Sequence, residues 1–125
     1  MAMKPTIGRI VIYKLTEDDT SQINRRRTSG SFIAERIKNN GAEMVNLTNL
    51  PATWPLGAQA HIGNWASAGT EYPCIVCAVW PHEFGQDKPG INGQVFLDGN
   101  DTLWVTSIGE GTENGQWHWP AKENA

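Results

Sequence analysis

The chain has 125 residues, enough for one hydrophobic core but too few for two, so we expect a single domain over residues 1–125. Its formal net charge at pH 7 is −3, which gives no overall field that would attract DNA or RNA. No stretch contains the about 18 consecutive apolar residues that a membrane span needs, and the N-terminal sequence MAMKPTIGRI is not typical of a secretory signal. We therefore expect a cytoplasmic protein with no nucleic-acid or membrane partner.

The N-terminal part of the sequence predicts one strand and two helices. Residues 10–15 mix β-branched and aromatic side chains, which is typical of a strand. Thr16 follows as a helix N-cap, and acidic residues in the first turn and arginines in the last turn suit a helix that ends near Arg27. A second helix is predicted over residues 32–40, with Gly41 as its stop signal.

From Ala42 onward the helical period disappears, residues 46–57 are rich in turn signals, and beyond them short strand patterns alternate with glycine-rich turns. The sequence DGND predicts a tight hairpin turn, and GEGTENG predicts the same kind of link between the last two strands. The expected fold is α+β: two N-terminal helices followed by an antiparallel β-sheet meander in a single domain. The predicted strands cover residues 59–62, 74–80, 94–97, 103–108 and 116–119.

Neither the cysteines nor the histidines form a pattern typical of catalysis or metal binding. Cys74 and Cys77 form a single CxxC, but residues three apart in a strand point to opposite faces, so we expect two unpaired core cysteines. The histidines lack the close spacing of metal ligands, and the sequence contains no GxSxG, GxGxxG or P-loop motif. We therefore expect a protein that is not an enzyme and that holds neither a metal nor a cofactor.

The run of arginines at residues 25–27 is open to two interpretations. It is either a solvated helix end that complements the helix dipole or a recognition site for a phosphate group. Consecutive residues spread around a helix, so one or two of these side chains, such as Arg25 and Arg26, are the most that could face a common ligand.

The polar, glycine-rich connection over residues 81–93 is the strongest candidate for a binding segment. It is longer than a typical hairpin loop, and long loops are often functional. Phe84 could stack on a planar base while Asn92 forms hydrogen bonds to it; the alternative is a disordered loop whose phenylalanine tucks into the core. The contacts that the loop itself predicts are therefore Phe84 and Asn92.

Two further tryptophans, Trp117 and Trp119, are expected to have a different role. At strand spacing they share one face, which indicates a place in the core or in a subunit interface rather than a ligand platform.

Several segments resemble small proteins encoded by bacteriophages: KPTIGRIVIY followed by INRRR, GAQAHIGN, and NGQVFLDGNDTLWVTS. Among these, the chain resembles the phage Thoeris anti-defence sponge proteins of the cyclic ADP-ribose-binding type, over nearly its whole length. The resemblance implies a helix-decorated antiparallel sheet that forms homo-oligomers, either dimers or hexamers built as trimers of dimers, in the host cytoplasm. It also implies that the protein holds a cyclic ADP-ribose isomer made by an immune TIR enzyme, without cleaving it.

The resemblance also implies contacts for this ligand. A loop between two strands closes over the signal in the family, and this loop matches residues 84–94 here. Asn92 would be the counterpart of a family ligand contact, and Phe84 or His82 the loop aromatic. For such a ligand we expect Phe84 or Trp80 to stack on the adenine, and Asn92 and Gln94 to form hydrogen bonds to the base or the ribose. One arginine of residues 25–27, from the same or a neighbouring subunit, would offset the pyrophosphate charge.

Two further expectations limit this assignment. Some family members bind cyclic oligonucleotides at a second site through arginines late in the chain, but this sequence has no arginine after Arg36, so we expect no such site. The alternative function is a phage structural or protein-interaction module with no small-molecule ligand, in which the aromatic residues form subunit contacts.

Overall fold

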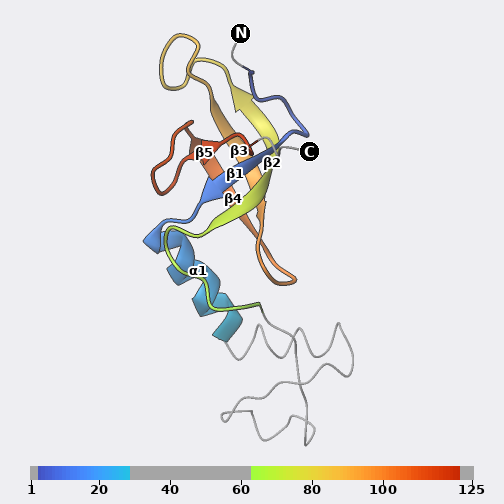
Figure 1. The fold of residues 1–125 in the computed structure, drawn as a ribbon, viewed down its shortest axis with the longest axis vertical. Helices are drawn as coiled ribbons and strands as arrows, with labels where there is room; N and C mark the ends of the chain where they lie inside the picture. Colours follow the sequence, from blue (N-terminus) through green and yellow to red (C-terminus); the bar gives the residue numbers. More distant parts are fainter. Residues whose placement is uncertain (1–2, 29–62, 122–125) are drawn as a thin grey trace, which may run out of the picture.

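A computed structural model describes residues 3–28 and 63–121 (Figure 1). These residues form one helix and a five-stranded antiparallel sheet, which confirms the α+β class. The predicted helix over residues 32–40 and the predicted strand over residues 59–62 lie outside the described residues. None of the helical structure described is long and apolar enough to cross a membrane. The elements are β1 (Ile10–Lys14), α1 (Glu17–Thr28), β2 (Glu71–Trp80), β3 (Gly90–Phe96), β4 (Thr102–Ile108) and β5 (Trp117–His118).

The strands lie in the order β4-β3-β2-β1-β5, and each neighbouring pair is antiparallel. The DGND turn joins β3 to β4 with Phe96 opposite Thr102, as predicted. β5 departs from the predicted meander, because it pairs with β1 at the other edge, where Trp117 lies opposite Tyr13. The GEGTENG link is therefore not a hairpin turn; it carries the chain from one edge of the sheet to the other.

The two edges of the sheet, β4 and β5, come together at Trp117. Its backbone N–H donates to the carbonyl of Gly109 at 3.0 Å, and its own carbonyl accepts from the N–H of Gly111 at 2.8 Å. Glu110 and Trp117 consequently form a parallel bridge just beyond β4. The sheet is thus curled into a partly closed barrel, and the side chain of Trp117 is fully buried at this seam.

The core lies inside this curled sheet. Side chains along β1 and β3 alternate between buried and accessible positions, as the two-residue period of a strand requires. The pair of Trp117 and Trp119 is scaffold, as predicted: their ring centroids lie 5.4 Å apart at nearly right angles. The buried apolar residues are Val11, Tyr13, Leu15, Ile23, Ala66, Cys74, Val76, Ile91, Val95, Leu97, Leu103, Val105 and Trp117.

The two cysteines lie on opposite faces of β2, so the prediction that both are in the core is half wrong. Cys74 is buried and Cys77 is exposed, and both are free. A register shift between Val76 and Ala78 places Cys77 at an irregularity in the pairing of β2 with β3. Burial raises the pKa of the Cys74 thiol to about 12, so this group is inert core material.

Thr16 is the N-cap of α1, as predicted, and the cap is reciprocal. The backbone N–H of Asp19 donates to Thr16 Oγ1 at 3.0 Å, and the backbone N–H of Thr16 donates to Asp19 Oδ2 at 2.9 Å. The hydroxyl of Tyr13 donates to the same carboxylate oxygen at 2.5 Å. Burial, reinforced by this hydrogen bond to Asp19, raises the pKa of Tyr13, so the phenol stays protonated and ties β1 to the helix.

Candidate functional site

The loop between β2 and β3 covers residues 81–89 and is a compact turn rather than a disordered segment. Its backbone is bonded internally: Phe84 N–H donates to the carbonyl of Lys88 at 3.0 Å, and Lys88 N–H donates to the carbonyl of Gly85 at 3.1 Å. Gly85 and Asp87 have φ values of 130° and 58°, which allow the tight reversal. The loop therefore holds Phe84 in one place before any ligand arrives.

The predicted loop ran to residue 93, whereas β3 already begins at Gly90. The reason is a close approach between two strands. A Cβ atom at Gly93 would lie 2.8 Å from the carbonyl oxygen of Ile75 in β2, so a glycine inside β3 allows this pairing. Asn92 and Gln94 are consequently strand residues and not parts of the loop.

The ring of Phe84 lies on glycines at the end of the sheet. A Cβ atom at Gly109 would lie 3.3 Å from the ring atom Cε2, and one at Gly90 would lie 2.9 Å from the same atom. The side chain is 50% exposed, so the ring is neither in the core nor free in solvent. The ring edge from Cδ2 to Cζ thus lies close to the backbone of these glycines, and half of the side chain stays accessible.

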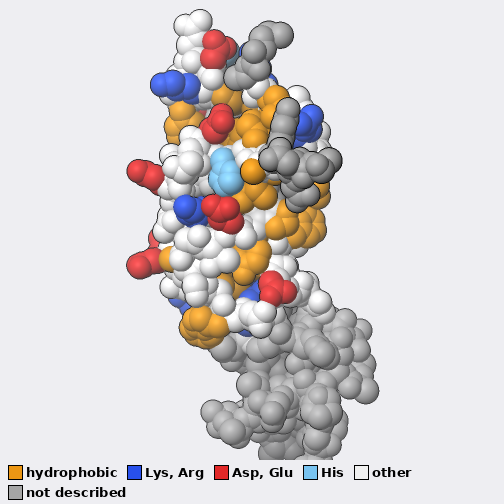
Figure 2. Space-filling model, in the orientation of Figure 1, with side chains coloured by type: hydrophobic (Ala, Val, Ile, Leu, Met, Phe, Trp, Pro, Cys, Tyr) orange, Lys and Arg blue, Asp and Glu red, His pale blue; other side chains and the backbone are white. Residues whose placement is uncertain are grey.

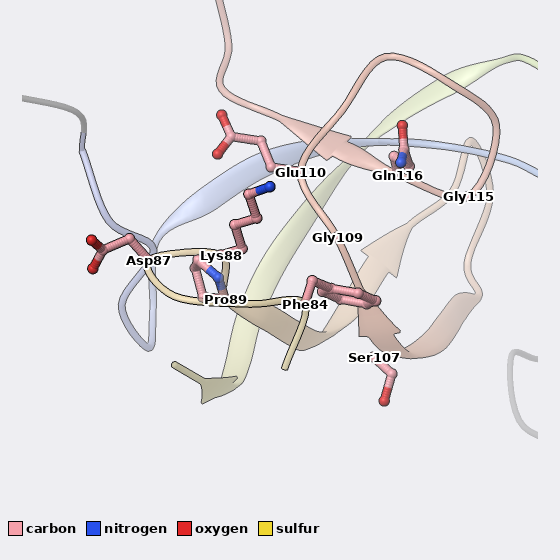
Figure 3. A pocket seen from close by; sticks show the side chains of 9 residues that line it. All are labelled: Phe84, Asp87, Lys88, Pro89, Ser107, Gly109, Glu110, Gly115 and Gln116. Carbon is pink, nitrogen blue, oxygen red and sulfur yellow. The ribbon is translucent and has the colours of Figure 1, made fainter. Parts of the chain in front are cut away.

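A pocket of about 640 Å³ opens beside this ring, between the loop and the segment that follows β4 (Figure 3). The Lys88 side chain extends toward Glu110 across one side of it, whereas Asp87 points away (Figure 3). The lining thus offers an aromatic surface, an ammonium group, a carboxylate and uncharged polar groups. We call it the Phe84 pocket; its lining residues are Phe84, Asp87, Lys88, Pro89, Ser107, Gly109, Glu110, Gly115 and Gln116.

Asn92 and Trp80 are in contact but do not line the Phe84 pocket. Asn92 Oδ1 accepts hydrogen bonds from Trp80 Nε1 at 3.2 Å and from the backbone N–H of Ser107 at 2.9 Å. The pairing of β3 with β4 shifts register at this point, between Ile91 and Gly93, and Ser107 has a φ of 56°. The Asn92 amide therefore stabilises a β-bulge, and its carbonyl oxygen is already engaged.

His82 and Gln94 do not line the Phe84 pocket either, and each lies in a different part of the surface. His82 lines a smaller cavity of about 240 Å³ between the loop and residues 4–6. An exposed ion pair of 3.7 Å between Lys4 and Asp87 connects the same two segments. Gln94 lies on the outer face of the sheet, paired with Ile75 in β2 and Trp104 in β4. Of the predicted contacts in this part of the chain, the Phe84 pocket therefore contains only Phe84.

The three consecutive arginines have three different environments. Arg27 is 3% exposed, and its guanidinium donates to both carboxylate oxygens of Asp101 at 2.7 and 2.9 Å. Arg26 donates to the carbonyl at the start of β4 at 2.9 Å. Arg25 lines a separate hollow of about 570 Å³ beside the exposed Trp65. In one copy of the chain these arginines lie at the end opposite the loop over residues 81–89 (Figure 1).

The Arg27–Asp101 pair fixes the C-terminal end of α1 to the turn between β3 and β4. Burial alone would raise the pKa of the Asp101 carboxyl, but hydrogen bonds and charge from Arg27, together with the charge of Arg26, hold it below its usual value. The carboxylate is therefore ionised and paired at neutral pH, and Arg27 serves structure rather than ligand binding.

Sequence reasoning missed most of the pocket lining, notably Lys88, Ser107, Glu110 and Gln116. Lys88 is in the predicted loop itself, whereas no local signal could identify the other three, because the end of β4 and the segment after it reach the loop only when the sheet closes at Trp117. Within residues 3–28 and 63–121, no three His, Cys, Asp or Glu side chains are grouped to hold a metal ion. No family model, no curated protein and no solved structure matches the chain.

Proposed function

We propose that this protein binds a nucleotide-sized ligand in the Phe84 pocket and sequesters it without cleaving it. The observation that carries the proposal is the half-exposed ring of Phe84, held against glycines beside a pocket of about 640 Å³. This volume is in the range of small-molecule sites, about 300–1,000 Å³. Because the loop's own hydrogen bonds already hold the ring, binding orders little of the protein, and a fixed aromatic face is a suitable platform for a base.

The other lining groups suit the remaining parts of a nucleotide. The Lys88 ammonium group can pair with a phosphate oxygen, and the Glu110 carboxylate can accept hydrogen bonds from ribose hydroxyl groups. Ser107 and Gln116 add uncharged polar groups at the same pocket. A ligand with two phosphates needs more positive charge than Lys88 provides. Because Arg27 is buried against Asp101, Arg25 or Arg26 of a neighbouring subunit is the candidate for supplying it.

The sequence resemblance to phage Thoeris anti-defence sponges selects the first ligand to test, a cyclic ADP-ribose isomer. In that role the protein is encoded by a bacteriophage, acts in the host cytoplasm and removes an immune signal before the signal reaches its effector. Binding alone is sufficient for this role, so no catalytic group is required.

Calorimetric titration with cyclic ADP-ribose isomers, ADP-ribose and AMP tests the binding. We expect the Phe84→Ala variant to lose about 10- to 100-fold in affinity, because stacking of a base on an aromatic side chain contributes about 1–3 kcal/mol. Phe84→Trp retains an aromatic face and should retain binding. His82→Ala is the matched control, because His82 is in the same loop but lines a different cavity.

Heating the saturated protein then separates sequestration from catalysis. Recovery of the intact ligand supports sequestration, and recovery of a cleaved product would identify an enzyme. If no nucleotide binds or stabilises the protein, the proposal is wrong. A protein-interaction module then becomes the better explanation, supported by the exposed aromatic residues on the outer face of the sheet.

A further inference from the structure

One side-chain oxygen connects the two walls of the Phe84 pocket. Asn92 Oδ1 accepts hydrogen bonds from Trp80 Nε1 at 3.2 Å and from the backbone N–H of Ser107 at 2.9 Å. Trp80 is the last residue of β2, and its carbonyl accepts from the N–H of Glu83 at 3.4 Å, in the first turn of the loop that carries Phe84. Ser107 is near the end of β4 and lines the opposite side of the pocket. Asn92 thus ties the loop to the segment that faces it.

The backbone of Ser107 has a conformation that needs support. Its φ of 56° lies in the left-handed region, which a residue with a Cβ atom rarely adopts. The register shift explains the conformation, because β4 places two residues, Thr106 and Ser107, opposite the single residue Asn92 of β3. Residues in rare backbone conformations persist where their surroundings hold them, and they are concentrated at functional sites. The hydrogen bond from Ser107 N–H to Asn92 is such a hold.

The extra residue in β4 decides which side chains face the pocket. Val105 is buried before the bulge, and beyond it Ile108 packs against the core while Ser107 is exposed. A shift of one residue exchanges the two faces of a strand, so a β4 without the bulge would turn Ser107 inward and Ile108 outward. Gly109 would then also turn, and it would no longer lie against the Phe84 ring.

The surroundings along both strands offer no charged substitute for the Asn92 oxygen. The strand residues that flank the network carry no charge; they are Ile91, Gly93, Thr106 and Ile108. Hydrophobic side chains also gather along one flank of the sheet (Figure 2). In this uncharged setting the amide of Asn92 supplies the acceptor for the N–H of Ser107.

We propose that Asn92 is a positioning residue of the Phe84 pocket. Through its oxygen it holds Ser107 in the left-handed conformation and so keeps Gly109 against the Phe84 ring. This role differs from the ligand contact that the sequence resemblance implies for Asn92. Walls that are held in place before binding lower the cost of ordering the site, so loss of the oxygen should weaken binding. The effect on binding rests on the proposed function, whereas the position of the walls can be measured in the ligand-free protein.

Nuclear magnetic resonance of the ligand-free protein tests the position of the walls. The ring current of Phe84 shifts the α-proton signals of Gly109, since a Cβ atom at Gly109 would lie 3.3 Å from the ring. We expect Asn92→Ala to reduce this shift and Asn92→Asp to retain it, because a carboxylate can accept both hydrogen bonds. Gln94→Ala is the matched control, because this amide lies two positions along β3 and does not line the pocket. Identical Gly109 signals in Asn92→Ala and wild type would overturn the proposal.

A double-mutant cycle with Ser107→Gly distinguishes positioning from direct contact with the ligand. Glycine adopts a positive φ without strain, so position 107 then needs no support from Asn92. In titrations with cyclic ADP-ribose isomers, Asn92→Ala should lower the affinity about tenfold in the wild-type background but less than about threefold in the Ser107→Gly background. An equal loss in both backgrounds would assign Asn92 to the ligand and overturn the proposal. If wild type binds no nucleotide, the proposed function fails, and the Gly109 signals still decide the role of Asn92.

Discussion

At the scale of single residues, the Arg27–Asp101 pair has the clearest consequence for stability. Both side chains are less than a tenth exposed, at 4% and 9%. Asp101→Asn leaves the Arg27 charge buried without its counterion, so we expect a loss of about 3–5 kcal/mol in the free energy of unfolding. Urea unfolding at neutral pH measures this loss. Asp87→Asn, which removes a carboxylate from an exposed ion pair, should cost less than about 1 kcal/mol.

The same pair contributes to the acid sensitivity of the protein. The pKa of Asp101 is lower in the folded state than in the unfolded state, so the pair's stabilisation is present above the unfolded value of about 4 and is lost as the pH falls through the folded value. The urea midpoint of wild type should therefore fall as the medium is acidified below about pH 5, and this decline should be shallower in Asp101→Asn. Identical pH slopes in the two proteins would exclude this role for the carboxyl group.

The arginine run also shows what the sequence could not predict at this scale. The charge of residues 25–27 suited either a helix end or a phosphate site, and each alternative depends on what surrounds the guanidinium groups. The partner of Arg27 is Asp101, 74 positions away in the chain. Such a partner follows from the packing of α1 on the turn between β3 and β4, which no local pattern encodes.

At the scale of elements, the cap of α1 gives two neighbouring acidic residues, Asp18 and Asp19, different contributions to stability. Thr16→Ala removes one capping hydrogen bond and should cost about 1 kcal/mol. Asp19→Ala should cost more, because Asp19 also accepts from the hydroxyl of the buried Tyr13. Asp18→Ala is the control, because the structure gives Asp18 only a favourable position in the first turn, with an effect of about 0.3–1 kcal/mol. Equal urea midpoints for Asp18→Ala and Asp19→Ala would contradict this account.

Local patterns predicted the elements well where local chemistry decides them. The β-branched and aromatic run of β1, the cap at Thr16 and the DGND turn all rely on neighbouring residues, and all are present in the structure. The start of β3 was mispredicted because Gly90, Asn92 and Gly93 are poor strand formers. Close approach to β2 requires the glycine at position 93, so tertiary packing overrides the propensity there.

At the scale of the whole molecule, closure of the sheet creates the candidate site. Sequence reasoning identified Phe84 on one side of the pocket, because an aromatic in a long polar loop is visible locally. The opposite side comes from residues 107–116, and their position depends on the return of β5 to β1. A meander would have placed β5 beside β4 instead, and the segment that faces Phe84 would then lie elsewhere.

Trp117 connects the β4 edge of the sheet to the β5 edge, so its substitution tests whether closure of the sheet stabilises the whole fold. Trp117→Ala removes a fully buried ring that packs at the seam, and we expect a loss of about 3–5 kcal/mol in the free energy of unfolding. Trp117→Phe should cost less than about 2 kcal/mol, because the buried Nε1 has no hydrogen-bond partner among the described residues and the phenyl ring preserves most contacts. Trp65→Ala, at an exposed position, should change stability by less than about 0.5 kcal/mol. If Trp117→Ala is as stable as Trp65→Ala in urea, the sheet holds its curvature without this seam. If Trp117→Phe costs as much stability as Trp117→Ala, the indole N–H has an essential partner.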